Sequence, residues 1–189
     1  MRTPGDVPFM HWLRDRGSLT ARIQARGRFT VRVLRQRLCP PTRDEAQLLG
    51  MEAKAFAWLR EVVLLCVDQR VVFAHTVLPR RPRGPLQVWL SRLGERSLGA
   101  LLFSHAGFRR GQMNFKRLDY RHPLFSPASN ALRLPDGTVN TLWARRSHFR
   151  FGIQSVLVTE VFSPLVLKLR TADQLSSDRK SAAPSEAML

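Results

Sequence analysis

The chain has 189 residues, 44% of them hydrophobic, and a formal net charge of +17 at pH 7. This length predicts one domain with a real core, and no apolar run approaches the roughly 20 residues that cross a bilayer. Its two cysteines, Cys39 and Cys66, form neither a disulfide framework nor a zinc motif, so we expect a protein of the reducing cytoplasm. The positive charge is compatible with three kinds of partner: nucleic acid, an anionic membrane surface or a small anionic substrate.

The first quarter of the chain predicts three short helices and one half-buried strand. Ser18 is a suitable N-cap for the second helix, and Thr42 with Glu45 has the form of a capping box that opens the third. Apolar and polar residues alternate through the strand. The expected ranges are 7–13 and 19–25 for the first two helices and 46–51 for the third, and the strand, with its alternation at 29–33, is expected to end at Cys39-Pro40-Pro41.

The stretch 56–67 predicts a buried central strand, because it is continuously apolar and rich in β-branched residues. Alternate residues of a strand share a face, so Arg60 lies on the same face as Trp58 and Val62. An unpaired buried charge is costly, so an inward Arg60 would require a carboxylate from the protein or from a ligand. The alternative is an arginine at the rim of the sheet with its head group in water, which is the commoner arrangement.

The remaining sequence predicts a hairpin, two helices and three further strands. Asp68-Gln69 is expected to form the hairpin turn, and Ser97 to begin a helix whose first turn is either an anion site or ordinary packing. Arg109, Arg110 and Lys116 are expected to point outward from their strand. The expected ranges are 70–78, 108–118, 143–151 and 153–162 for strands, 86–93 for a helix and 120–139 for a loop.

These elements predict an α+β domain built on a single six-stranded antiparallel sheet flanked by helices. The domain is expected to cover residues 1–171, because the composition from 172 to 189 turns to small and polar residues typical of a disordered tail. In the last strand Glu160 shares a face with Val156, Val158 and Phe162, so a carboxylate lies among apolar groups there.

Motif searches exclude several kinds of chemistry. The sequence has no Gly-rich phosphate loop, no nucleophile elbow, no histidine pair with metal-ligand spacing and no Cys-x-x-Cys. We therefore expect neither metal nor covalent catalysis. The features that remain as candidates for a functional site are one inward arginine, one inward carboxylate and the start of one helix.

Five short motifs carry a more specific signal: Trp58-Leu59-Arg60-Glu61, Thr76-Val77-Leu78-Pro79, Leu98-Gly99 with Leu102-Phe103, Trp143-Ala144-Arg145-Arg146-Ser147 and Thr159-Glu160-Val161-Phe162. In order and spacing they resemble the chorismate pyruvate-lyase family, over residues 12–164. The resemblance implies a twisted six-stranded antiparallel sheet with an internal site. It also implies a lyase that converts chorismate to 4-hydroxybenzoate and pyruvate, the first step of ubiquinone synthesis in many bacteria, without metal or organic cofactor.

The resemblance also implies roles for individual residues. Arg60 would bind the ring carboxylate of the substrate, and the backbone of Leu98 would be the second contact to that carboxylate. Glu160 would contact the 4-hydroxyl group, and Leu19 would contribute a backbone contact. Arg60 and Glu160 are the expected catalytic residues.

One position departs from the family pattern. His75 stands where some members have an arginine, so either His75 or another arginine such as Arg146 would hold the enolpyruvyl carboxylate. A histidine is only partly charged at neutral pH and would hold that carboxylate less firmly.

Two other functions compete with the lyase. A non-catalytic, small-anion effector domain of the same fold would be preceded by a DNA-binding domain, whereas only about 11 residues precede Trp12. A nucleic-acid-binding protein would use the net charge, but no recognisable module is present. We therefore expect an enzyme with chorismate as its partner, no nucleic acid, no membrane span and a monomeric state.

Overall fold

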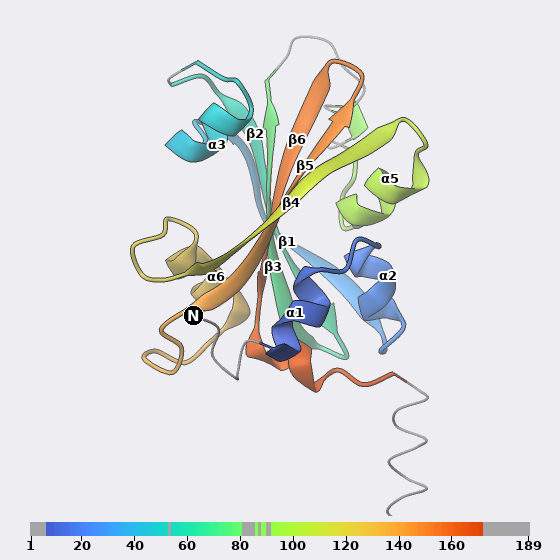
Figure 1. The fold of residues 1–189 in the computed structure, drawn as a ribbon, viewed down its shortest axis with the longest axis vertical. Coiled ribbons are helices and arrows are strands. Elements are labelled where there is room, and N and C mark those ends of the chain that lie inside the picture. The colour runs from blue at the N-terminus through green and yellow to red at the C-terminus, as the bar shows by residue number, and fades with distance from the viewer. Residues whose placement is uncertain (1–6, 53, 81–85, 87, 90–91, 172–189) are drawn as a thin grey trace, which may run out of the picture.

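The structure is a computed structural model that describes residues 7–52, 54–80, 86, 88, 89 and 92–171 (Figure 1). Within these residues the strands form one six-stranded antiparallel sheet, in the order β1-β2-β3-β6-β5-β4. The first three strands and the last three each form a meander, and the pairing of β3 with β6 joins the two. The strands are β1 (Phe29–Cys39), β2 (Ala57–Cys66), β3 (Gln69–Pro79), β4 (Phe108–Leu118), β5 (Leu142–Phe151) and β6 (Gln154–Phe162).

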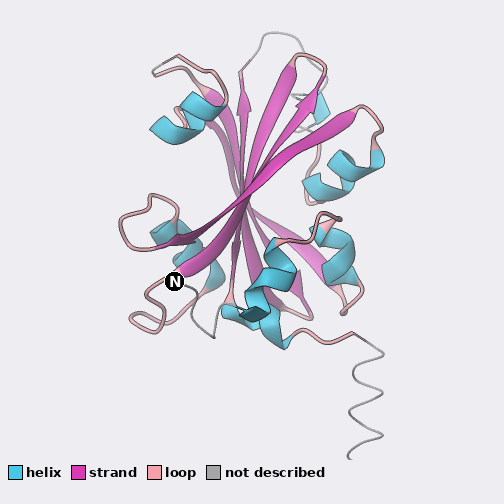
Figure 2. Ribbon diagram, in the orientation of Figure 1, coloured by secondary structure: helices cyan, strands magenta, loops and turns pink. Residues whose placement is uncertain are grey.

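Helices cover both faces of this sheet, which confirms the predicted α+β class (Figures 1 and 2). Helices α1, α2 and α5 lie on one face, and α3 and α6 lie on the other. The helices are α1 (Val7–Leu13), α2 (Leu19–Gln24), α3 (Arg43–Leu48), α5 (Leu98–Ser104) and α6 (Phe125–Leu132), followed by the 3-10 helix η2 (Pro164–Lys168). None of the helices in the described residues has the length and apolar character needed to span a bilayer.

The central strands are buried because both of their faces carry apolar side chains. Val62 and Leu64 of β2 pack in a core with Ile23 of α2, whereas Val63 packs on the other face in a core with Leu132 of α6. This alternation follows from the period of two in an extended chain. The face under α1, α2 and α5 is the one that carries Arg60, because Arg60 alternates with Val62 and Leu64.

The hairpin between β2 and β3 turns one residue earlier than the sequence predicted. Val67 and Asp68 have φ angles of 47° and 63°, so both central residues of the turn are left-handed. Such a pair is typical of the type I′ turn that fits the twist of antiparallel strands. The prediction of Asp68-Gln69 was wrong because Val67, a β-branched residue, is disfavoured at positive φ.

Two other predictions of secondary structure need correction. The expected loop 120–139 contains helix α6, whose Pro127 lies in the first turn, where a proline is tolerated. Helix α3 has the predicted capping box, with the backbone N–H of Thr42 donating to Glu45 Oε2 at 3.0 Å, but it runs from Arg43 rather than from residue 46. Parts of the expected helix 86–93 and all of the expected tail 172–189 lie outside the described residues.

Candidate active site

Arg60 and Glu160 line one pocket on the face of the sheet beneath α2 and α5. The strand register explains this, because Arg60 pairs with Thr76 and Thr76 pairs with Val158, two residues from Glu160 on β6. Cross-strand partners present their side chains to the same face. The pocket is lined by Leu19, Thr20, Arg60, Val62, Leu64, Ala74, Thr76, Ser97, Leu98, Gly99, Leu102, Phe103, Arg110, Phe149, Val158 and Glu160.

The Arg60 guanidinium is buried, and its hydrogen-bond partners among the described residues are neutral groups. The residue is 3% exposed, which rules out the arrangement at the rim of the sheet. Its Nη1 donates to Gln36 Oε1 at 2.9 Å, and its Nη2 donates to the carbonyl oxygens of Gly94 and Arg96 at 2.7 and 3.3 Å. Burial lowers the pKa of Arg60, and no carboxylate of the described residues forms an ion pair with it. A guanidinium has five N–H donors, so Nε and one Nη1 hydrogen remain for a ligand.

Glu160 is held by an ion pair with Arg145, whose Nε donates to Glu160 Oε2. Arg145 is 1% exposed, and its Nη1 also donates to the carbonyl oxygens of Trp12 and Asp15 at 3.1 and 2.9 Å. These contacts tie the segment after α1 to the floor of the pocket. Because Arg145 engages Oε2, the other carboxylate oxygen, Oε1, can accept a hydrogen bond from a ligand hydroxyl.

The other two predicted positions, Leu19 and Leu98, close the pocket from above. Each begins a helix behind a serine N-cap, since Ala21 N donates to Ser18 Oγ at 3.3 Å and Ala100 N to Ser97 Oγ at 3.4 Å. The two helices meet where Thr20 Oγ1 lies 2.5 Å from Ser97 Oγ. We call this contact the helix clasp.

Arg110 of β4 lines the pocket, so the prediction that it points outward was wrong. Its Nε and Nη2 donate to Ser147 Oγ at 3.1 and 2.8 Å, and its Nη1 donates to the Arg16 carbonyl oxygen at 3.0 Å. Burial lowers the pKa of Arg110, as does the nearby charge of Arg145. A usable signal was present in the sequence: Arg109 and Arg110 are adjacent, so in a regular strand both cannot point outward.

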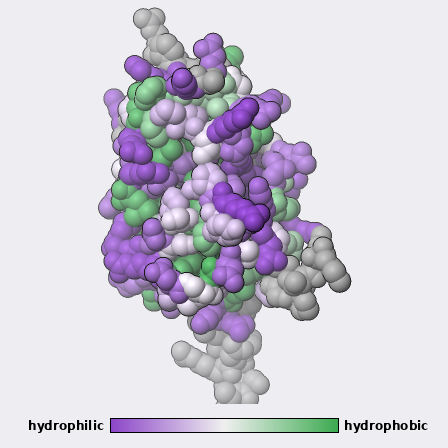
Figure 3. Space-filling model, turned by 90° about the vertical axis from the view of Figure 1, so that its left-hand side faces the viewer, coloured by the Kyte–Doolittle hydropathy of each residue, from purple (hydrophilic) through white to green (hydrophobic). Residues whose placement is uncertain are grey.

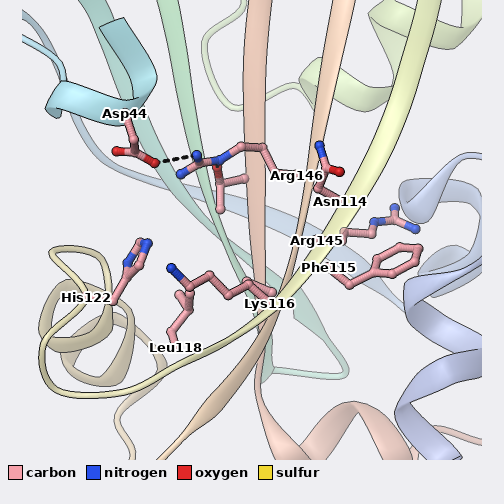
Figure 4. A pocket seen from close by; sticks show the side chains of 10 residues that line it. Asp44, Asn114, Phe115, Lys116, Leu118, His122, Arg145 and Arg146 are labelled. Carbon is pink, nitrogen blue, oxygen red and sulfur yellow. Dashed lines mark hydrogen bonds and ion pairs between the residues drawn. The ribbon is translucent and has the colours of Figure 1, made fainter. Parts of the chain in front are cut away.

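The structure does not bring His75 or Arg146 to this pocket. His75 pairs with Glu61 rather than with Arg60, and it is buried on the opposite face, with Nδ1 2.9 Å from Glu61 Oε1 and Nε2 3.1 Å from Glu45 Oε1. Arg146 donates to Asp44 Oδ2 at 2.6 Å on that same face, whereas its neighbour Arg145 points the other way (Figure 4). Neither residue lines the pocket that holds Arg60 and Glu160.

A second cavity, of about 220 Å³, lies on the face that carries α3 and α6 (Figure 4). Arg146 reaches across it to Asp44 of α3, and the side chains of Lys116 and His122 point toward each other. Hydrophilic residues cover much of this face, with smaller apolar areas between them (Figure 3). The described residues contain no group of three or more His, Cys, Asp or Glu side chains placed to hold a metal ion.

Comparison with known proteins identifies the family. The family model described as chorismate lyase matches residues 6–170. A probable chorismate pyruvate-lyase from Dechloromonas aromatica is 48% identical over 160 residues, covering 84% of this chain and 88% of that protein. The corresponding protein from Nitrosospira multiformis is 42% identical, covering 84% of this chain and 87% of that protein.

Solved structures show the same fold at much lower identity. The effector domain of PhnF from Mycobacterium smegmatis is similar with a TM-score of 0.58 and 18% identity, covering 78% of this chain and 89% of that domain. At that identity the likeness concerns the fold alone. The sequence relatives and the matched family model together show that this chain belongs to the chorismate lyase family.

Proposed function

We propose that this protein is a chorismate pyruvate-lyase that converts chorismate to 4-hydroxybenzoate and pyruvate. The observation that carries the proposal is a buried guanidinium, that of Arg60, without a carboxylate partner among the described residues and in one pocket with Glu160. The relatives named above support the same activity. We propose further that the enzyme works as a monomer in the cytoplasm, at the first step of ubiquinone synthesis.

The reaction suits a site without strong acids or nucleophiles. Chorismate carries a ring carboxylate, an enolpyruvyl ether at C3 and a hydrogen at C4 beside the hydroxyl that is retained. Breaking the C3–O bond while the C4 hydrogen moves to the enolpyruvyl methylene makes the ring aromatic and releases pyruvate. The two products contain all the atoms and electrons of the substrate, so the step needs no oxidant or reductant.

The protein therefore has to hold the reactive conformer and stabilise the charge that develops on the departing enolpyruvyl oxygen. Arg60 is suited to the ring carboxylate, because its buried guanidinium has no carboxylate partner among the described residues and keeps two N–H donors for a ligand. Glu160 Oε1 is suited to the 4-hydroxyl group. The backbone at Leu98 and Leu19 would complete the ring site, since both residues line the same pocket.

The pocket must open to admit the substrate. The free space in it is about 40 Å³, room for a few water molecules, whereas small-molecule sites are typically about 300–1,000 Å³. The lining residues from α2 and α5 form its cover, so we expect these helices to separate on binding. Closure over the bound ring would then exclude water from the reacting atoms.

The test is to incubate the purified protein with chorismate and to follow pyruvate and 4-hydroxybenzoate together. We expect equal amounts of the two products, unchanged by EDTA, and a loss of kcat/KM of roughly 100-fold or more in Arg60→Ala, since hydrogen bonds to charged groups contribute about 1.5–3 kcal/mol each. The matched control is Arg146→Ala, which removes a guanidinium from the opposite face and should leave kcat/KM within about threefold.

Circular dichroism and thermal melting would verify that both variants are folded. Binding of a ring carboxylate without pyruvate release would contradict the lyase and support the effector-domain alternative. Near-normal turnover by Arg60→Ala would contradict the role of Arg60.

A further inference from the structure

We propose that Arg110 binds the second carboxylate of the substrate, the one on the enolpyruvyl side chain. The proposal rests on the proposed function and deepens it. Chorismate is a dianion, and a pocket that fixed only the ring carboxylate would leave the departing group unrestrained. The cation at the other end of the pocket is then part of the catalytic site.

The position of Arg110 follows from the strand register. Arg110 pairs with Phe149 on β5, and Phe149 pairs with Val156 on β6, so all three share the face that carries Glu160. Arg60 comes from β2, on the far side of β3 and β6 from β4. The two guanidiniums therefore lie on the same face and enter the pocket from strands toward opposite edges of the sheet, with Glu160 on a strand between them.

The charge of the pocket matches a dianion. Among the described residues, two guanidiniums, those of Arg60 and Arg110, and one carboxylate, that of Glu160, line the pocket, and Arg145 neutralises that carboxylate through a direct ion pair. Arg110 itself contacts a hydroxyl and a carbonyl oxygen, both neutral. The net charge of two is compensated by chorismate but only half compensated by 4-hydroxybenzoate, which has a single carboxylate. We therefore infer that this pocket distinguishes substrate from product by charge.

Arg110 is also held rigidly enough to orient a ligand. Its guanidinium carbon lies 5.5 Å from the ring centre of Phe103 and 5.3 Å from that of Phe149, within the range of cation–π contacts. Three of its five N–H donors are used by Ser147 and Arg16, which leaves one hydrogen on each Nη for a carboxylate. Two such donors on one planar group favour a bidentate contact.

The other cations considered from the sequence do not fill this role. His75 and Arg146 lie on the opposite face, where each contacts acidic side chains of its own. Arg145 donates from Nε to Glu160 and from Nη1 to two backbone carbonyl oxygens, so its contacts hold the protein's own groups in place. Of the cations in the part of the chain that the structure describes, Arg110 is the pocket residue left to bind the second carboxylate.

The experiment compares two inert ligands that differ by one carboxylate: 3-(carboxymethoxy)-4-hydroxybenzoate and 3-methoxy-4-hydroxybenzoate. Calorimetry on the wild-type protein should give a Kd for the dianion roughly tenfold lower than for the monoanion, as expected of one charge-assisted contact. In Arg110→Gln the two Kd values should converge. The methoxy ligand should bind with the same Kd, within about threefold, to variant and wild type.

The kinetic counterpart is a rise in KM for chorismate of roughly 10- to 100-fold in Arg110→Gln. Arg146→Gln on the other face is the control and should keep the wild-type preference. Equal affinity of the wild-type protein for both ligands would overturn the proposal. So would a preference that survives in Arg110→Gln.

These outcomes are independent of turnover, because neither ligand reacts. Failure of the wild type to release pyruvate from chorismate would contradict the lyase. The affinities for the two ligands would still show whether Arg110 binds the second carboxylate. If Arg110→Gln fails to fold, Arg110→Lys provides the second variant. Lysine keeps the positive charge but lacks the planar guanidinium. Its preference for the dianion should therefore be weaker than that of the wild type, but not lost.

Discussion

Two ion pairs of this protein differ in how much water reaches them. The Arg145 and Glu160 side chains are 1% and 14% exposed, whereas those of Arg28 and Asp68 are 68% and 73% exposed. Removal of one partner from a buried pair leaves an uncompensated charge, while exposed pairs contribute little.

Glu160→Ala is therefore expected to lower the free energy of unfolding by roughly 3 to 5 kcal/mol. Arg28→Ala, the control at the exposed pair, should change it by less than about 1 kcal/mol. Urea denaturation followed by tryptophan fluorescence measures both. Equal effects of the two substitutions would contradict the assignment of Arg145 and Glu160 as a buried pair.

His75 should make stability depend on pH. Burial alone would lower the pKa of His75, but its contacts with Glu45 and Glu61 outweigh burial and raise the pKa above the usual 6.5. The contribution of the charged imidazolium is then fully present below pH 6.5 and is lost as the pH rises through the raised folded-state pKa. Arg35 and Arg146 also contact these two carboxylates.

His75→Gln should remove this pH dependence. The variant is expected to be less stable than the wild type at pH 6, with a difference that shrinks at alkaline pH. Denaturation midpoints measured from pH 6 upward test this. A wild-type slope that persists in His75→Gln would show that another group titrates.

At the residue scale the sequence predicted part of the site. Alternation along two strands placed Arg60 and Glu160 on apolar faces, and the register then brought the two faces together. The pairing partners of Arg110 and His75 could not be read in that way. Which face each occupies depends on strand register, which is set by contacts between distant segments.

The helix clasp is the element that should control access to the pocket. Thr20→Val keeps the shape of the side chain but removes the hydrogen bond between Thr20 Oγ1 and Ser97 Oγ, which are 2.5 Å apart. A net hydrogen bond contributes about 0.5–1.5 kcal/mol, so dissociation of 4-hydroxybenzoate should accelerate by roughly two- to tenfold. Stopped-flow fluorescence measures the rate.

The control for the clasp is Thr30→Val on β1, where the threonine is exposed and, because it alternates with Val31 of the core beneath α2, lies on the opposite face of the sheet. It should leave the dissociation rate unchanged. An unchanged or slower rate in Thr20→Val would mean that the two helices do not limit release.

The turn between β2 and β3 stores strain that can be removed. Val67 is β-branched, 57% exposed and at a φ of 47°, a conformation that Asn tolerates better. Val67→Asn is expected to raise the free energy of unfolding by about 1 kcal/mol. Chemical denaturation tests this, and a lower stability of the variant would contradict it.

At the scale of elements the sequence predicted the strands best. The bounds of β4, β5 and β6 fall within a residue of those expected, and Gly152, at a φ of 55°, marks the turn between the last two. Helix α6 was missed, because two of the three prolines in 120–139 flank it and the third lies in its first turn. Local signals for a loop were outweighed by the packing of Ala128 and Leu132 against the sheet.

At the scale of the molecule, the sheet separates two charged systems. One face holds the pocket with Arg60, Arg110 and Glu160, and the other holds the buried network around His75. The fold alone does not decide the function, because the effector domain of PhnF has a similar fold. Membership of the chorismate lyase family and the placement of charges in the pocket favour a lyase.

The most direct test is a crystal structure of the protein bound to 4-hydroxybenzoate. We predict the ring in the pocket beneath α2 and α5, with its carboxylate on the Arg60 guanidinium and its hydroxyl within hydrogen-bond distance of Glu160. A ring seated instead in the cavity beside Lys116 and His122, or bound beneath α2 and α5 with its two ends reversed, would contradict the account.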